Sequence, residues 1–222
     1  MSAREDMLGR IRVALADVPA SEPASWDETQ DDDGGARYNR VSTLAAPAAV
    51  ELFAERCGEY RARMTRVRGG DAALRRAIEA ACARHGVASL VIPADLPAAW
   101  QPTTVACKGD QPPLSLSQLD SVDGTLTGCA LAIAETGTIV LDGGTAQGRR
   151  ALTLLPDLHI CVVKERQIVA GVPEALEQLG ATVRASGRPL TLISGPSATS
   201  DIELQRVEGV HGPRRLEVVI VA

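Results

Sequence analysis

Apolar residues along the chain follow a helical spacing in some segments and form short continuous runs in others. From about residue 46, one stripe steps by three or four residues and predicts a helix with a single buried face. The members of this stripe are Val50, Phe53, Cys57, Tyr60 and Met64. A second helix is expected over 71–84, and residues 89–93 read as a short buried strand. Helices followed by buried strands are typical of an α/β sheet.

The second half of the chain repeats this alternation. The pattern predicts strands over 129–133, 138–141, 158–163, 190–193 and 216–221. It predicts helical segments over 151–155, 171–180 and 199–204. Six or seven strands with helices between them favour an α/β fold, with a mostly parallel sheet covered by helices on both faces.

The first 44 residues have a different character. Apolar residues of the segment 3–16 gather on one helical face, at Met7, Leu8, Ile11 and Leu15. Residues 19–40 are rich in acidic residues and proline and poor in aliphatic residues, which is typical of a linker. We therefore expect an N-terminal amphipathic helix in 1–18, a flexible acidic linker in 19–44 and an α/β domain in 45–222.

Composition narrows the classes of function. The chain has 222 residues, of which 45% are hydrophobic and 23% charged, and this mixture excludes a wholly disordered or collagen-like chain. Only five residues are aromatic (one Phe, two Trp and two Tyr) and the net charge is −5, which argues against a nucleic-acid-binding protein. The opening residues have no apolar signal core, and no apolar run approaches the length of a membrane span. We expect a soluble, cytoplasmic protein.

The cysteines and glycine motifs argue against several common sites. Five widely separated cysteines contain no CxxC pair, which disfavours a zinc or iron–sulfur site built by this chain alone and fits reduced thiols. No HExxH motif or similar histidine cluster is present, so we expect no metal in this chain. Residues 143–150 have the glycine spacing of a P-loop, but Arg149 and Arg150 replace the required Lys and Ser or Thr.

The first candidate site is the turn between the strands expected at 129–133 and 138–141. Glu135 is followed by Thr136, Gly137 and Thr138. A carboxylate at a buried strand end can act as a base or a nucleophile because burial raises its pKa. The alternative is a plain polar turn, in which Gly137 adopts a positive φ and the threonines cap it.

The second candidate is a small-residue turn that follows the strand at 190–193. It consists of Ser194, Gly195, Pro196 and Ser197, followed by Thr199, Asp201 and Glu203. Such a turn aims backbone N–H groups and hydroxyls at one point, which suits a phosphate or carboxylate. Ligands of open α/β sheets also bind at the carboxyl ends of strands. The alternative is an ordinary helix cap, since Ser200 and Glu203 have capping-box spacing.

The third candidate is His211, which lies in a turn rich in Gly and Pro over residues 209–213. A histidine exposed in such a turn titrates near neutral pH and can transfer a proton. The alternative is a loop histidine that is merely solvated or bonded to the backbone.

These motifs, in this order, resemble the lactate-utilization protein C family, whose domain is called the LUD domain. The segments that carry the resemblance are 134–138, 154–156 with His159, 194–197, 201–203 and 209–213. The resemblance covers the chain from about residue 45 to 222, and the N-terminal helix is similar to the opening helix of the family.

The resemblance implies a three-layer α/β/α sandwich like that of the sugar-phosphate isomerases and CoA-transferases. It also implies a non-redox subunit of a system that oxidises L-lactate to pyruvate together with iron–sulfur partner proteins. No cofactor is then expected in this chain, and the iron–sulfur clusters are expected in the partner subunits. The family assigns no catalytic residue, so the motif positions stand as candidates.

Three hypotheses follow for the function. In the first, the turn at 194–197 and Thr199 hold a small carboxylate, and Glu135 or His211 transfers a proton during lactate oxidation. In the second, the chain is a stand-alone isomerase or CoA-transferase-like enzyme, in which Glu135 attacks a thioester or moves a proton on a sugar phosphate. In the third, it is a non-catalytic module that binds a metabolite or assembles with a partner through its N-terminal helix.

Overall fold

The structure is a computed structural model. It describes residues 3–14, 16, 44–200, 206–209 and 211–222. The chain divides into two units, Met1–Tyr38 and Asn39–Ala222.

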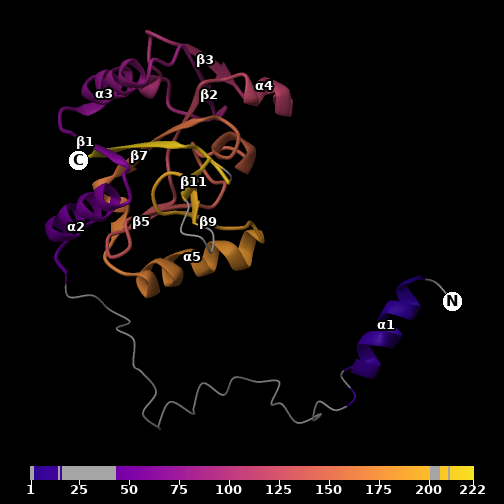
Figure 1. Ribbon diagram of the computed structural model, residues 1–222. Helices are drawn as coiled ribbons and strands as arrows, with labels where there is room; N and C mark the ends of the chain where they lie inside the picture. Colours follow the sequence, from indigo (N-terminus) through magenta and orange to yellow (C-terminus); the bar gives the residue numbers. More distant parts are fainter. Residues whose placement is uncertain (1–2, 15, 17–43, 201–205, 210) are drawn as a thin grey trace. The chain divides into compact units, whose positions relative to one another are not determined.

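A six-stranded sheet lies at the centre of the second unit (Figure 1). Its strands are β1 (Arg63–Val67), β2 (Ser89–Ile92), β3 (Ala106–Gly109), β4 (Gly124–Thr127), β7 (Leu158–Lys164) and β12 (Arg215–Val221). Their order is β1-β12-β7-β4-β2-β3, and every pairing is parallel. The central strands β7 and β12 are buried almost throughout, as expected for parallel strands covered on both faces.

Helices cover both faces of this sheet. On one face, α2 (Ala46–Glu59) packs Phe53 against Cys161 and Val218. On the opposite face, α3 (Gly70–His85) packs Ile78 against Ile160 and Val219. Successive residues of a strand point to opposite faces, so the alternation of residues 160 and 161 separates the two cores. The predicted α/β fold, with a mostly parallel sheet between helical layers, is confirmed.

A second, smaller sheet packs on the α2 side. It contains β5 (Leu131–Ile133), β6 (Thr138–Leu141), β8 (Ile168–Val169) and β9 (Thr191–Ile193) in the order β8-β5-β6-β9. One face shares a core with α2 through Ala132 and Ile139, and α5 (Val172–Ser186) covers the other face. β5 and β6 pair antiparallel around the predicted turn at 134–137. The strands that the pattern predicted for one sheet are therefore divided between two.

Short elements complete the second unit. They are η1 (Ala98–Trp100), α4 (Leu116–Asp120), η2 (Arg150–Thr153), η3 (Glu165–Gln167), β10 (Ala198–Ser200) and β11 (Arg206–Glu208). β10 and β11 pair antiparallel with each other. α4 and η2 close the far end of the main sheet on the α2 side, where Leu119 and Leu152 pack on Val91.

The differences between the predicted elements and the structure include two helices and the strand β4. The helical stripe was expected to reach Met64, but α2 ends at Glu59 and the chain turns at Arg61, whose φ is +67°, to place Met64 in β1. The helix expected over 199–204 is wrong at Thr199, which lies in β10, and residues 201–204 lie outside the described residues. β4 was not predicted because two of its four residues are threonines, whose hydroxyls are nevertheless bonded inside the fold.

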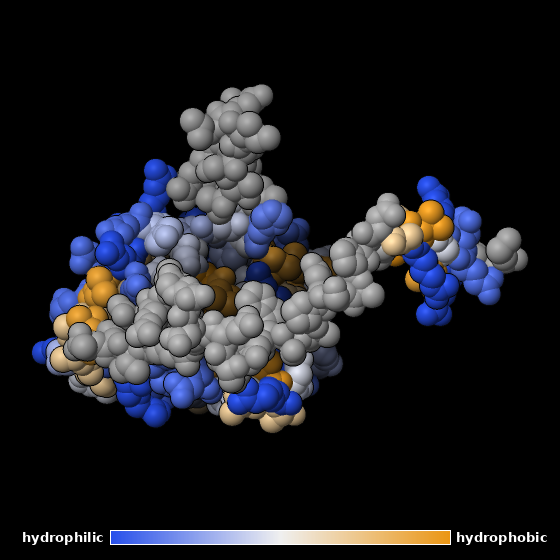
Figure 2. Space-filling model, turned by 90° about the horizontal axis from the view of Figure 1, so that it is seen from below, coloured by the Kyte–Doolittle hydropathy of each residue, from blue (hydrophilic) through white to orange (hydrophobic). Residues whose placement is uncertain are grey.

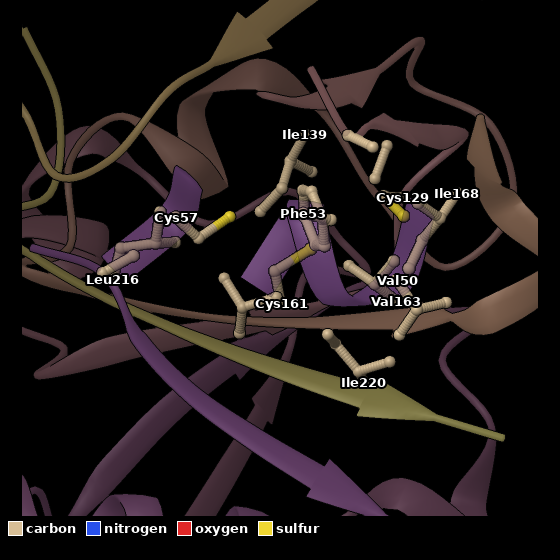
Figure 3. Packing of buried hydrophobic residues seen from close by; sticks show 14 of the residues in the cluster. Val50, Phe53, Cys57, Cys129, Ile139, Cys161, Val163, Ile168, Leu216 and Ile220 are labelled. Atoms are coloured by element: carbon tan, nitrogen blue, oxygen red, sulfur yellow. The ribbon is translucent and has the colours of Figure 1, made fainter. Parts of the chain in front are cut away.

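Phe53 lies at the middle of the core between α2, the main sheet and the second sheet (Figure 3). Three of the five cysteines, Cys57, Cys129 and Cys161, belong to this same cluster. Few aromatic residues are available, so this core is filled by aliphatic side chains and thiols.

The first unit contains α1 (Ala3–Ala14), close to the predicted span 3–16. Leu15, one of the four apolar positions used for that prediction, lies outside the described residues. Apolar and charged side chains both lie on the surface of this helix (Figure 2), and Met7, Ile11 and Val13 are exposed.

Candidate functional site

A cavity of about 230 Å³ opens at the amino ends of β7 and β12, against the second sheet. It is lined by Arg150, Thr153, His159, Thr191, Leu192, Ile193, Ser194, Gly195, Pro196, Ser197, His211, Gly212, Pro213 and Leu216. The second and third sequence motifs therefore meet here, because the turn at 194–197 and His211 line one space. A cavity of this size suits a small metabolite rather than a nucleotide cofactor.

Backbone and hydroxyl contacts join these two motifs. The backbone N–H of Ser197 donates to the carbonyl of Pro213 (2.8 Å), and its Oγ accepts a hydrogen bond from the backbone N–H of His211 (3.1 Å). The backbone N–H of Gly209 donates to the carbonyl of Ser197 (3.0 Å). The turn before β12 is thus fixed on the turn after β9, and His211 lies exposed at the rim.

The first motif reaches the cavity through a line of hydroxyl groups. Thr136 Oγ1 lies 2.7 Å from Thr138 Oγ1, and Thr138 Oγ1 lies 2.7 Å from Ser194 Oγ. Thr138 is buried, so its hydroxyl needs these partners. Each hydroxyl can both donate and accept, and the line therefore fixes the orientation of the Ser194 hydroxyl at the cavity wall.

Gly137 and Gly195 have a structural role. Gly137 has φ +58°, and a Cβ there would lie 2.8 Å from the Cβ of Arg56 on α2. Gly195 has φ +81°, and a Cβ there would lie 2.6 Å from the Cβ of Tyr60. Both motif glycines thus let a turn pack directly on the end of α2, which accounts for part of the pattern that marked these turns as candidate sites.

Glu135 lies apart from the cavity. Its side chain is exposed and is not among the residues that line the cavity. Its backbone N–H donates to the carbonyl of Ala170 (3.0 Å), so the residue closes the end of the second sheet.

The remaining candidates of the second motif lie beyond the turn. Thr199 lies in the short strand β10. Asp201 and Glu203 lie outside the described residues. The part of this motif that meets the cavity is therefore residues 194–197.

Arg150 brings a positive charge to the cavity, and the sequence analysis did not select it. Its Nη1 donates to the carbonyl (2.8 Å) and the hydroxyl (3.0 Å) of Thr153, which hold the guanidinium at the rim. Partial burial lowers the pKa of Arg150 from its ordinary value, but an arginine remains charged. In the sequence it stood out as a mismatch to the P-loop pattern and as part of a basic pair with Arg149.

His159 is the second group that the sequence analysis did not select as a site residue. Its side chain is 1% exposed, and it lies at the start of β7, where it lines the cavity. Its Nε2 lies 2.8 Å from Thr127 Oγ1 on the neighbouring strand. The sequence feature that could have identified it is a single histidine in the otherwise apolar run 158–163. Such a histidine is more often a hydrogen-bonded residue of the core than a site residue.

The carboxyl ends of the parallel strands hold polar groups that bind one another. Arg149 Nε and Nη2 donate to Asp110 (2.7 and 2.9 Å), and this pair lowers the pKa of the Asp110 carboxyl. Asp142 accepts from the side chain of Gln147 (2.8 Å), and the ammonium of Lys164 lies 5.6 Å from the centre of a Trp100 ring. Arg149 and Arg150, which are adjacent in the segment with P-loop glycine spacing, thus have different surroundings. Arg149 forms an ion pair with Asp110, and Arg150 lines the cavity.

Within the described ranges, no group of three or more His, Cys, Asp or Glu side chains is placed to hold a metal ion. No helix of that same part of the chain is long and apolar enough to cross a membrane.

The cavity thus combines one guanidinium, two serine hydroxyls and two imidazoles around a small space. A guanidinium and hydroxyls bind a carboxylate well, because they donate several hydrogen bonds to its two oxygens. An imidazole at the same site can exchange a proton with a neighbouring group of the ligand.

Comparison with known proteins gives consistent matches. A family model described as the LUD domain matches residues 115–221. Lactate utilization protein C of Deinococcus radiodurans is 53% identical over 184 residues, which are 83% of this chain and 84% of that protein. Lactate utilization protein C of an Exiguobacterium species is 32% identical over 144 residues, 62% of each chain. The crystal structure of a DUF162 family protein from Deinococcus radiodurans superposes with a TM-score of 0.70 at 44% identity, covering 81% of this chain and 99% of that one.

Proposed function

This chain belongs to the lactate utilization protein C family of LUD-domain proteins, and from that membership we propose that it acts in lactate utilization. We propose further that it is the non-redox subunit of a system that oxidises L-lactate to pyruvate. One observation carries the proposal, the 53% identity to a protein named for lactate utilization over 84% of that protein's length.

The cavity supports a small carboxylate as the ligand. Arg150 supplies a cation at the rim, and Ser194 and Ser197 supply hydroxyls on the opposing turn. The guanidinium would pair with the carboxylate of lactate or pyruvate, and the serines would orient it. Of the two predicted proton-transfer residues, His211 lines the cavity and Glu135 does not, which favours His211 for a proton at the ligand's hydroxyl.

The electron carriers would belong to partner proteins. Cys57, Cys129 and Cys161 pack in one core, and Cys82 and Cys107 pack in the core on the other face of the sheet. Thiols spread in this way through two hydrophobic cores do not form the ligand set of an iron–sulfur cluster. We therefore propose that the clusters belong to iron–sulfur partner subunits, and that this chain assists them by binding the acid.

The test is growth of a strain that lacks this gene on L-lactate as sole carbon source, with the gene restored on a plasmid as the comparison. We expect a growth defect that is specific to L-lactate and is rescued by the gene. Normal growth, in a strain shown to contain no second lactate-oxidising system, would contradict the proposed function.

Variants in the same strain test the cavity. Arg150→Gln removes the cation and leaves a shorter, neutral polar side chain, and Ser194→Ala removes one hydroxyl. We expect both to impair growth on L-lactate, and the arginine variant to have the larger effect because it loses a charge-assisted contact. Arg166→Gln, at an exposed arginine in η3, is the matched control and should grow normally.

A further inference from the structure

The main sheet contributes two side chains of opposite character to the cavity, and together they form what we call its floor. His159 on β7 and Leu216 on β12 both line the cavity, and both are buried. They are partners in register on adjacent parallel strands, and such strands lie about 4.8 Å apart. The floor therefore presents an imidazole and a branched alkyl group side by side to a ligand.

The imidazole of His159 is held through one of its two nitrogens. Its Nε2 lies 2.8 Å from Thr127 Oγ1, and both side chains are buried. Thr127 belongs to β4, which flanks β7 on the side away from β12 and Leu216. When the threonine hydroxyl donates to Nε2, the ring carries its proton on Nδ1. Nδ1 is then the donor that His159 can offer to a ligand.

Leu216 makes the neighbouring part of the floor apolar. It belongs to the core around Phe53 (Figure 3) and also lines the cavity, where Ile193 and Pro213 extend the apolar surface. A polar group of a ligand placed against this surface would lose its hydrogen bonds to water and gain none. An alkyl group placed there would instead be removed from water, which is favourable.

The third contact is the guanidinium at the rim. Arg150 donates to the carbonyl and the hydroxyl of Thr153, which is buried, so the cation has a fixed support in η2. It lines the same cavity as His159 and Leu216. A cation, an imidazole and an alkyl group thus surround one small space.

We propose that His159 and Leu216 are specificity-determining residues that select a 2-hydroxy or 2-oxo acid with a short alkyl side chain. His159 binds the oxygen on C2 of the acid, Leu216 contacts its alkyl group, and Arg150 pairs with its carboxylate. This inference rests on the proposed function, which supplies the carboxylate at Arg150 and the choice of L-lactate.

The contact with His159 serves substrate and product alike. The Nδ1–H group can donate to the hydroxyl oxygen of lactate and to the carbonyl oxygen of pyruvate, because both are acceptors. The proton of the lactate hydroxyl stays available to His211, and His159 itself forms and breaks no covalent bond. An acid without an oxygen on C2 would leave the Nδ1–H group unpaired in a buried place, which is unfavourable.

The same three contacts distinguish the two enantiomers of lactate. C2 of lactate carries a carboxylate, a hydroxyl, a methyl group and a hydrogen. With the carboxylate at Arg150, the opposite enantiomer exchanges the positions of the hydroxyl and the methyl group. The methyl group would then face the N–H donor of His159, and the hydroxyl would face Leu216, so both contacts become unfavourable.

The first experiment compares five acids that differ at C2. Nuclear magnetic resonance titrations of the full chain give the affinities for L-lactate, D-lactate, pyruvate, propionate and glycolate. We expect L-lactate and pyruvate to bind at least about 10-fold more tightly than propionate, which has no oxygen on C2. L-lactate should bind about 10-fold more tightly than D-lactate and than glycolate, which has no methyl group. Equal affinities for L-lactate and propionate would overturn the role of His159, and equal affinities for L-lactate and glycolate that of Leu216.

Variants assign each preference to its residue. His159→Phe keeps a ring and removes both nitrogens, so the preference for L-lactate over propionate should disappear while that over glycolate remains. Leu216→Ala should have the reverse effect. The matched controls are His85→Gln, at a partly buried histidine bonded to Glu217, and Val218→Ala, on the strand and in the core of Leu216. Neither control residue lines the cavity, so both variants should keep both preferences.

Each result is a ratio of two affinities measured on one variant, so a general loss of stability does not change it. A preference for L-lactate over propionate that survives in His159→Phe would overturn the role of His159. Loss of a preference in its control variant to the same extent would overturn the assignment to the floor.

Milder variants keep the proposal testable if these do not fold, and a thermal melt identifies those that fold. Thr127→Val removes the hydroxyl that holds the imidazole, and should lower the preference for L-lactate over propionate by about threefold. Leu216→Val shortens the alkyl group by one carbon and should lower the preference over glycolate. An unchanged preference in either folded variant would contradict the role of the residue concerned.

Failure of this inference and failure of the proposed function give different results. Binding of all five acids with equal affinity would overturn the floor alone, because the proposed function requires only that L-lactate binds. Tighter binding of D-lactate than of L-lactate, with the same effects of the variants, would support the floor and contradict the proposed substrate. Binding of none of the five acids would contradict the proposed ligand, and this inference with it.

Discussion

The polar side chains at the two ends of the parallel sheet have different surroundings. At the carboxyl end, Arg149 and Asp110 bind each other through two hydrogen bonds, and Asp142 binds Gln147. At the amino end, Arg150 and His211 line a cavity with the serine turn. Ligands of open α/β sheets usually bind at the carboxyl ends of the strands. Here that end is filled by mutual pairs, and the cavity lies at the opposite end.

This difference shows that a second sheet, packed on the main one, can create a cavity at the amino end of the main sheet. The turn at 194–197 does follow the carboxyl end of a strand, but that strand is β9 of the small sheet. Because the small sheet packs on the main one, this turn lies against the amino ends of β7 and β12. The cavity therefore lies at the carboxyl end of β9, as the rule for open α/β sheets predicts, but at the amino end of the main sheet.

The largest predicted effect concerns the packing that holds the cavity turn. Gly195→Ala would place a Cβ 2.6 Å from the Cβ of Tyr60 at a φ of +81°, so both the contact and the backbone become unfavourable. We expect a loss of about 2–4 kcal/mol in the free energy of unfolding, measured in urea.

The control for this change is Gly187→Ala. Gly187 has φ +63° with open space around its missing Cβ, so only the backbone term applies. It should lose about 1 kcal/mol. Equal losses for the two variants would mean that the contact with the end of α2 contributes little.

The next effect separates the carboxyl end from the cavity. Asp110→Asn leaves Arg149 without its carboxylate, and because Arg149 is partly exposed we expect a loss of only about 1–2 kcal/mol at neutral pH. Binding of L-lactate in the cavity should be unchanged. Weakened binding at full folding would show that the two ends are coupled and would break the comparison.

The same variant predicts a pH dependence. The folded-state pKa of Asp110 lies below its unfolded value, so its contribution is present above about pH 4 and is lost as the pH falls through the folded pKa. The difference in unfolding free energy between wild type and Asp110→Asn should therefore shrink on acidification. A difference that stays constant down to about pH 2 would contradict the ion pair.

The sequence predicted those helices and strands whose burial produces a local pattern of apolar residues. The apolar stripe of α2 and the apolar runs of β7 and β12 predicted the layers, because burial on one helical face or on both strand faces leaves a direct imprint. It missed β4, since Thr125 and Thr127 are polar residues whose burial depends on Val91 and His159 across the sheet.

The same limit applies to the site. Ser194, Ser197 and His211 were selected because small polar turns are visible locally, and these residues do line one cavity. Arg150 and His159 were not selected, because their role depends on which segments the two sheets bring together. Gly137 and Gly195 helped to mark their turns as candidate sites, but these glycines are explained in part by the close packing of both turns on α2.

The smallest predicted effect tests whether polar groups at the amino end position the site rather than stabilise the fold. Thr138 is bonded to Ser194 and Thr136, but Ser194 is exposed and can also bind water. Ser194→Ala should therefore lose less than about 1 kcal/mol of unfolding free energy, and Thr138→Val about 1 kcal/mol, since its hydroxyl is buried. A double-mutant cycle should give a coupling of about 0.5 kcal/mol in stability. In L-lactate binding the two changes should not add, because either one already releases the Ser194 hydroxyl from its fixed orientation. Additive losses in binding would mean that Thr138 and Ser194 act separately, and the line of hydroxyls would then stabilise the wall without orienting it.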